Sequence, residues 1–122
     1  MATKVLIAED EQNIVESLRF ILKREGYEVS AIFDGALVFD SLRTNPPDVM
    51  ILDVMLPKTN GFEILKLVRG DPRLAELPVI VITAKGQAHD RATAANLGAN
   101  AFLSKPFSNK DIVAEVKRLT TG

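Results

Sequence analysis

A short apolar run that ends in an acid constrains the fold of this 122-residue chain more than any other stretch. Residues 49–52 are all apolar, Asp53 follows them, and the chain turns at Pro57. Four to eight apolar residues bounded by turn residues are typical of a strand that is buried on both faces, as in parallel sheets. Asp53 would then lie at the carboxyl end of this strand, where open α/β sheets place ligands and reacting groups. The plainer interpretation of Asp53, taken alone, is an acid that caps a turn.

Four more strand-like runs alternate along the chain with segments of helical periodicity. The expected strands besides 48–53 cover residues 4–8, 27–32, 79–82 and 101–103, and the expected helices begin near residues 12, 35, 60, 87 and 108. Alternation of this kind predicts a parallel sheet with right-handed crossovers and five helices on its two faces. Five strands without a Gly-x-Gly-x-x-Gly motif after the first favour a flavodoxin-like, doubly wound α/β fold with the strand order 2-1-3-4-5.

The composition argues against several classes of protein. Because the chain has no cysteine, it has neither a disulfide framework nor a thiolate metal site. Its formal net charge of −1 and its scattered lysines and arginines argue against direct DNA binding. The first apolar run is too short for a signal peptide or a membrane span. We therefore expect a cytoplasmic protein without membrane contact, formed by a single domain over residues 1–122 and carrying no output domain.

Polar residues lie at the carboxyl ends of four of the five expected strands. They are Glu9 and Asp10, Asp53, Thr83, and Lys105. In the order 2-1-3-4-5 these strand ends share one edge of the sheet, so we expect their side chains to converge. Carboxylates about 5 Å apart repel each other by several kcal/mol at an effective dielectric constant of about 20, so protonation or a cation must compensate. Oxygen ligands without sulfur or histidine suit a hard divalent cation, and we expect Mg²⁺.

This combination of side chains favours phosphoryl transfer. An acid that faces a metal, a hydroxyl and a lysine is held in its ionised form, which makes it a poor general base but a reasonable nucleophile toward phosphorus. Phosphoryl transfer requires positioning and neutralisation of three equatorial oxygens, and Mg²⁺, the Lys105 ammonium and the Thr83 hydroxyl could each take one. The expected product is an aspartyl phosphate on Asp53.

Landmarks in chain order carry a resemblance to a known family. They are Ala8-Glu9-Asp10, the sequence ILDVMLP at residues 51–57 with Gly61 after it, Thr83-Ala84, and Lys105-Pro106-Phe107. Over essentially its whole length the chain resembles the receiver domain of two-component response regulators. The acidic pair is Glu-Asp where the family more often has Asp-Asp.

The resemblance implies a role for each matching residue. Asp53 would be the phosphoacceptor. Mg²⁺ would be bound directly by the Asp10 carboxylate and through water by Glu9, with Asp53 and the backbone carbonyl of Met55 as its other ligands. The phosphoryl group would be contacted by Thr83, by Ala84 next to it in the chain, and by Lys105.

Two further features are implied by the same resemblance. The peptide bond before Pro106 would be cis, which would aim Lys105 into the site. Phe102 occupies the position of the switch aromatic, as a phenylalanine that has no hydroxyl in place of the more usual tyrosine. In the family picture, phosphorylation draws the hydroxyl residue inward and the aromatic rotates into the space vacated.

The implied function is that of a signalling module and not of an enzyme. A sensor histidine kinase or a phosphotransfer protein would phosphorylate Asp53. An output partner would then read the surface formed by the helix after residue 87, the strand 101–103 and the last helix. The chain would be a monomer or a weak dimer.

Two other functions remain open from the residues. The chain could be a receiver-like scaffold that acts without phosphorylation. An aspartate-nucleophile phosphohydrolase of the haloacid dehalogenase type needs an acid two residues after the nucleophile, and Met55 occupies that position. Glu11 is expected only as an acid of a first helical turn. His89, the one histidine of the chain, is expected to be a solvated surface residue.

Overall fold

The computed structural model describes residues 2–57, 59–84 and 88–120. They form a parallel sheet of five strands in the order β2-β1-β3-β4-β5. The strands are β1 Lys4–Ala8, β2 Glu28–Ile32, β3 Val49–Asp53, β4 Val79–Thr83 and β5 Ala101–Ser104. The α-helices are α1 Gln12–Arg24, α2 Val38–Thr44, α3 Gly61–Gly70, α4 Ala88–Asn96 and α5 Asn109–Thr120. The flavodoxin-like fold and strand order expected from the sequence are confirmed.

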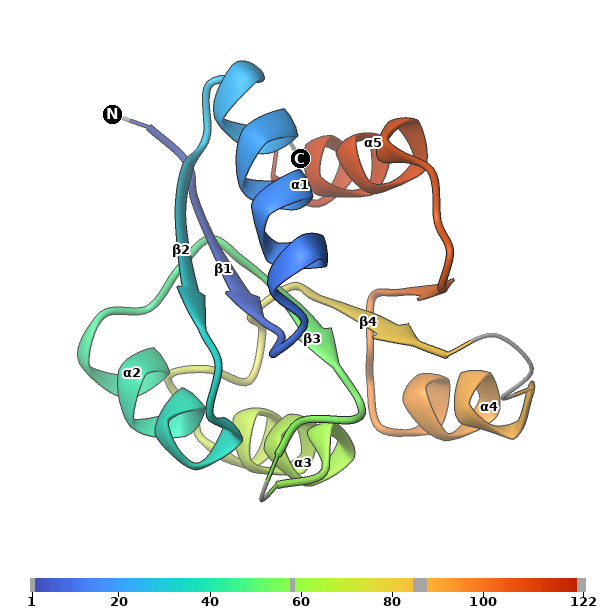
Figure 1. Ribbon diagram of the computed structural model, residues 1–122. Helices are drawn as coiled ribbons and strands as arrows, with labels where there is room; N and C mark the ends of the chain where they lie inside the picture. Colours follow the sequence, from blue (N-terminus) through green and yellow to red (C-terminus); the bar gives the residue numbers. More distant parts are fainter. Residues whose placement is uncertain (1, 58, 85–87, 121–122) are drawn as a thin grey trace.

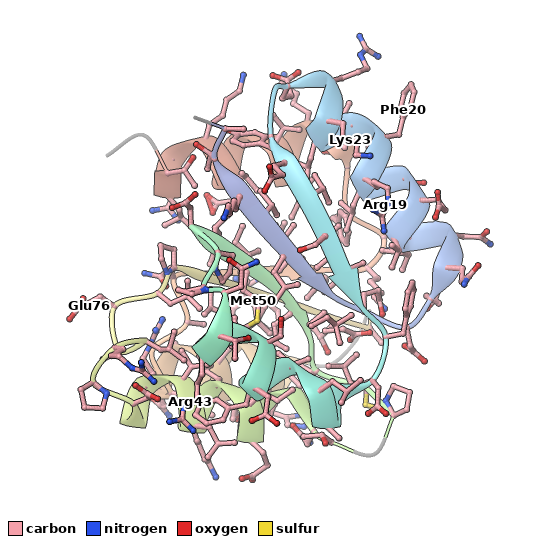
Figure 2. All side chains as sticks on the ribbon, turned by 90° about the vertical axis from the view of Figure 1, so that its left-hand side faces the viewer. Arg19, Phe20, Lys23, Arg43, Met50 and Glu76 are labelled. Atoms are coloured by element: carbon pink, nitrogen blue, oxygen red, sulfur yellow. The ribbon has the colours of Figure 1, made fainter. Side chains whose placement is uncertain are left out.

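Helices cover both faces of the sheet (Figure 1). Helices α1 and α5 lie on one face, where Leu18 and Ile112 pack against a cluster that includes Ile7 of β1. Helices α2, α3 and α4 lie on the other face, and Leu65 packs there against Met50 of β3. Figure 2 shows Met50 inside the molecule, whereas Phe20 points outward from α1 and is 66% exposed. The sheet is therefore a layer between two separate apolar cores.

Strands β3 and β4 differ from the other three in that every residue is buried. All five residues of β3 and all five of β4 are buried, and each strand ends in a polar residue, Asp53 and Thr83 respectively. The parallel register pairs Ala8 with Leu52 and Asp53 with Ile82, so the strands end at about the same level. The carboxyl ends of β1, β3, β4 and β5 thus meet at one edge of the sheet.

Three helix ends follow local sequence signals. The side chain of Asn60 accepts a hydrogen bond from the Phe62 N–H at 2.7 Å before α3, and Ser108 Oγ accepts one from the Asp111 N–H at 3.0 Å before α5. Gly26 follows α1 with a φ of 94°, a conformation that favours glycine. No helix within the described ranges is long and apolar enough to cross a membrane.

The second helical segment differs from the sequence expectation. A short 3₁₀ turn, η1 Gly35–Leu37, precedes α2 because Asp34 accepts a hydrogen bond from the Ala36 N–H at 2.9 Å and tightens the chain there. As a result Leu37 is 59% exposed, while Val38 and Leu42 fill the core as expected.

Gly61 brings the start of α3 against the end of β3. A β-carbon at this position would lie 2.5 Å from the Asp53 carbonyl oxygen and 2.8 Å from Val54 Cα, and both are backbone atoms. The Gly61 N–H also donates to the Val54 carbonyl oxygen at 2.8 Å. This close approach fixes the loop that leaves Asp53.

We expect Gly61→Ala to lower the free energy of unfolding by about 1–3 kcal/mol, because the added methyl group overpacks against the backbone of β3. Gly70→Ala is the matched control, since a β-carbon there meets no heavy atom within 4 Å. The control should be neutral or gain about 0.5–1 kcal/mol, because alanine favours the helix. Urea denaturation measures both, and equal stability of the two variants would contradict the close approach.

Candidate functional site

Three acids form a cluster at the carboxyl edge of the sheet. Asp53 ends β3 and is 2% exposed, and Glu9, which follows β1, is fully buried. Asp10 is exposed beside them, and one carboxylate oxygen from each of the three lies within 4.8 Å of the others. Because β1 and β3 are neighbours, the strand order brings these acids together from positions far apart in the chain. The donor set is all oxygen, which suits a hard cation such as Mg²⁺.

Lys105 enters the cluster from the end of β5. Its Nζ lies 2.9 Å from Glu9 Oε1 and 3.2 Å from Asp53 Oδ2, and 20% of its side chain is exposed. The Lys105–Pro106 peptide bond is cis. Burial alone would lower the pKa of Lys105, but its hydrogen bond to Glu9 and the negative charges of Asp53 and Glu9 raise that pKa above its usual value. The ammonium is therefore a fixed positive charge among the acids.

The crowding of the acids has its largest effect on the pKa of Glu9. Its Oε2 accepts hydrogen bonds from the Asp10 N–H at 3.0 Å and from the Glu11 N–H at 3.4 Å. Burial and the adjacent Asp53 carboxyl nevertheless raise the pKa of Glu9 to about 8, against the opposing effect of Lys105. Without a further cation, the cluster therefore favours a protonated Glu9 at neutral pH.

Asp53 is held by a different contact at each oxygen. Its Oδ1 accepts a hydrogen bond from the Met55 N–H at 3.0 Å, and its Oδ2 accepts one from Lys105 Nζ. The Met55 side chain is 69% exposed at the mouth of the site, beside an open depression of about 430 Å³ that Asp10 also lines. Metal ligation by the Met55 carbonyl stays a prediction.

The hydroxyl of Thr83 donates its hydrogen bond to Asp90 and not to Asp53. Thr83 is fully buried at the end of β4, and its Oγ1 donates a hydrogen bond of 2.9 Å to Asp90 Oδ2 in the first turn of α4. Ala84, the next residue, is exposed and lines a cavity together with Lys105. Of the residues expected at the site, Glu9, Asp10, Asp53 and Lys105 come together, whereas the Thr83 hydroxyl is engaged elsewhere.

Phe102 lies on β5 and is partly buried. The guanidinium of Arg91 in α4 is 4.7 Å from the centroid of its ring, within the range of a cation–π interaction. His89 is 80% exposed, as expected, and its Nε2 lies 3.3 Å from Asp90 Oδ1.

Three residues of this region were missed by the sequence reasoning. Glu11 is the N-cap residue of α1 and not part of its first turn, and its Oε1 lies 3.5 Å from Lys105 Nζ. Asp90 and Arg91 contact Thr83 and Phe102 respectively. For Asp90 a signal was present, because it is the single acid of α4, a helix otherwise rich in alanine.

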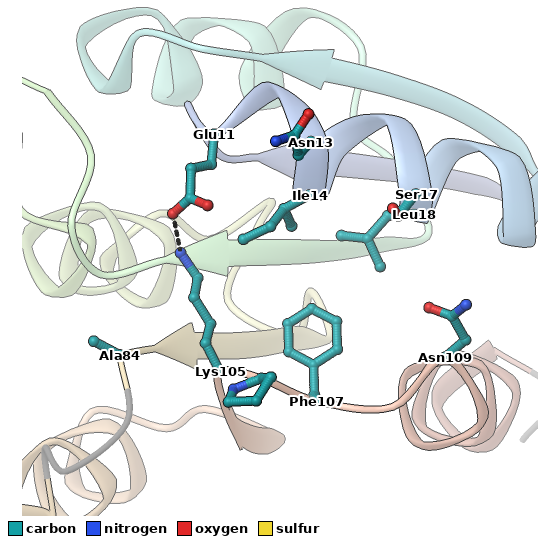
Figure 3. Close-up of a pocket in the computed structure, with 10 residues that line it drawn as sticks. Glu11, Asn13, Ile14, Ser17, Leu18, Ala84, Lys105, Phe107 and Asn109 are labelled. Carbon is teal, nitrogen blue, oxygen red and sulfur yellow. Dashed lines mark ion pairs between the residues drawn. The ribbon is translucent and has the colours of Figure 1, made fainter.

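The Glu11–Lys105 ion pair lies at the edge of a cavity of about 540 Å³ between α1 and the β5–α5 connection (Figure 3). Ile14, Leu18 and Phe107 give this cavity an apolar lining. The acidic cluster thus adjoins a concave apolar surface.

Solved structures share this architecture over nearly the whole chain. A protein from Chloroflexus aurantiacus J-10-fl, assigned as a response regulator, is 32% identical, with 100% of both chains covered and a TM-score of 0.95. The signal receiver domain of a signal transduction histidine kinase from Syntrophus aciditrophicus is 31% identical, with 99% of this chain and 92% of that chain covered and a TM-score of 0.91.

A third structure shares the fold at lower identity. The receiver domain of sensor histidine kinase PA1611 from Pseudomonas aeruginosa is 24% identical, with 100% of both chains covered and a TM-score of 0.90, and it has a magnesium ion coordinated in its active-site cleft. A family model described as the response regulator receiver domain matches residues 5–117. The chain therefore belongs to the response regulator receiver domain family, whose members are signalling modules of two-component systems.

Proposed function

We propose that this receiver domain accepts a phosphoryl group on Asp53 from a histidine kinase or a phosphotransfer protein, in the presence of Mg²⁺, and thereby alters a surface that a partner reads. The observation that carries the proposal is the position of Lys105, which is 3.2 Å from the Asp53 carboxylate. The ammonium places a positive charge beside the Asp53 carboxyl group and is available to neutralise a transferred phosphoryl group.

The reaction needs little from the protein beyond orientation and charge. A carboxylate oxygen of Asp53 attacks phosphorus, the bond from phosphorus to the donor nitrogen breaks, and the electron pair stays on the donor imidazole, which takes up a proton. The Met55 N–H and Lys105 hold the two oxygens of Asp53 in place during attack. Lys105 then remains beside the phosphoryl oxygens, where Thr83 and Ala84 complete the proposed binding site.

The charges of the cluster support a divalent cation. Three carboxylates face one ammonium, so up to two negative charges remain uncompensated when all groups are ionised. Asp10, Asp53, the Met55 carbonyl and, through water, Glu9 are the residues that would hold Mg²⁺. When bound, the ion supplies positive charge next to the phosphoryl oxygens.

Hydrolysis of phosphate esters is a poorer fit. Met55 has a thioether that can neither give nor take a proton at the position where a phosphohydrolase needs its acid.

The surface of α4, β5 and α5 is our proposed contact region for an output partner, because Thr83 and Phe102 both contact the first turn of α4. We propose a monomeric or weakly associating domain.

Incubation with a small phosphodonor and Mg²⁺ should add one phosphoryl group, as measured by intact mass. Asp53→Asn should lose the modification, because an amide cannot act as the nucleophile. The control is Asp40→Asn, which changes an exposed acid of α2 and should be phosphorylated to the same extent as the unchanged protein.

Modification that persists in Asp53→Asn would contradict the assignment of the phosphoacceptor. Equal affinity of an output partner with and without beryllofluoride, a phosphoryl mimic, would instead favour a scaffold that acts without phosphorylation.

The raised pKa of Glu9 predicts a pH-dependent stability. In the unfolded chain Glu9 loses its proton near its ordinary pKa of 4.5, whereas in the folded protein Glu9 keeps this proton up to about pH 8. The folded state binds more protons in between, so the metal-free protein should lose stability as the pH rises from about 5 to about 8. Mg²⁺ should reduce the loss, because it stabilises the ionised acids.

Thermal melts in a chelator across this range test the expectation. Glu9→Gln should flatten the dependence, whereas Glu16→Gln on the exposed side of α1 should keep it. The same slope in Glu9→Gln as in the unchanged protein would show that another group is responsible.

A further inference from the structure

The proposed phosphoryl transfer does not account for the buried contact between Thr83 and Asp90. Thr83 is fully buried and Asp90 is only 8% exposed, although Asp90 lies on a helix at the surface. The Thr83 hydroxyl donates to Asp90 Oδ2 at 2.9 Å. A carboxylate of this kind is seldom buried unless a specific partner stabilises it.

A threonine hydroxyl carries one proton and can donate only one hydrogen bond. While that proton is donated to Asp90, it is not available to an oxygen of a phosphoryl group on Asp53. An anionic phosphoryl oxygen would meet only the lone pairs of the hydroxyl, which repel it. The two hydrogen bonds of Thr83 therefore exclude each other.

We propose that Asp90 is a positioning residue that holds the Thr83 hydroxyl away from the phosphoryl site, so that phosphoryl binding at Asp53 requires the Thr83–Asp90 hydrogen bond to break. The inference rests on the proposed function, because it assigns Thr83 to the phosphoryl oxygens. It adds a residue of α4 to the groups that control the affinity of the site.

The strength of this hydrogen bond sets the size of the effect. A hydrogen bond from a hydroxyl to a carboxylate is stronger than one between neutral groups, and burial increases its strength. Such a bond changes an equilibrium by roughly ten- to a hundredfold. Asp90 should lower the affinity for a phosphoryl group by a factor of this order.

Helix α4 has other contacts that should keep it in place when the Asp90 side chain is removed. Arg91 covers the ring of Phe102 at 4.7 Å, and Ala94 is 1% exposed in the core. Truncation of Asp90 should therefore release the Thr83 hydroxyl without displacing the helix.

Binding of beryllofluoride in the presence of Mg²⁺, measured by isothermal titration calorimetry, tests the proposal. Asp90→Ala should bind about tenfold more tightly than the unchanged protein, or more. Asp90→Asn keeps an oxygen acceptor without the charge and should show a smaller gain. Asn96→Ala, an exposed change on the same helix, is the control and should bind as the unchanged protein does.

A double-mutant cycle separates release of the hydroxyl from a general effect on α4. Valine has the shape of threonine without the hydroxyl, so Asp90→Ala should change nothing in the Thr83→Val background. An equal gain in that background, or a gain below about twofold in Asp90→Ala, would overturn the proposal. If Asp90→Ala does not fold by circular dichroism, the same cycle with Asp90→Asn decides in the same way.

The unchanged protein distinguishes failure of this inference from failure of the proposed function. If it does not bind beryllofluoride, the phosphoacceptor function is overturned and the role of Asp90 with it. If it binds but Asp90→Ala binds no more tightly, only the role of Asp90 is overturned.

Discussion

Repulsion among carboxylates at the end of the sheet governs how this site is built. Glu9 and Asp53 are buried at the ends of neighbouring strands, and Asp10 lies beside them. Neither buried acid can be solvated as it would be in water, so each depends on donors and cations supplied by the protein. Lys105 reaches both of them within 3.2 Å. The elevated pKa of Glu9 follows because this one ammonium does not fully offset burial and the charge of Asp53.

The apolar strands make such a costly arrangement tolerable. Every residue of β3 and β4 is buried, and helices pack on both faces of the sheet. Burial of a large aliphatic side chain contributes about 1.5–3 kcal/mol, so a few residues such as Ile51 and Ile80 can offset the desolvation of one acid. The same strands fix the positions of the acids, because the parallel register aligns the strand ends. Stability and the geometry of the site therefore depend on the same sheet.

The sequence was sufficient for features that depend on one element or on strand order. The strand order followed from alternating apolar and helical patterns, and the convergence of Glu9, Asp53 and Lys105 followed from that order. Helix starts at Asn60 and Ser108 followed from side chains that cap their own helices. These features are local in sequence, or they are determined by topology alone.

The side-chain contacts made by individual residues could not be predicted from the sequence in the same way. The direction of the Thr83 hydroxyl depends on where α4 packs, and α4 has only a thin apolar stripe to reveal its buried side. Glu11 looked like an ordinary helix acid until the path of Lys105 was known. Leu37 was expected in a helix that the Asp34 cap shortens. The Thr83 and Glu11 contacts join different elements, whereas the Asp34 cap is a local contact that the sequence reasoning overlooked.

The contact between β4 and α4 also has a thermodynamic consequence for partners. A protein that binds α4 more tightly when the Thr83–Asp90 hydrogen bond is broken favours the same conformation as the phosphoryl group does. Because coupling between two ligands is reciprocal, that protein must stabilise the phosphorylated form by the same factor by which phosphorylation strengthens its own binding. A protein that prefers the intact contact must act in the opposite direction. Whether a partner stabilises or destabilises the phosphorylated form would thus depend on whether it prefers the Thr83–Asp90 hydrogen bond broken or intact.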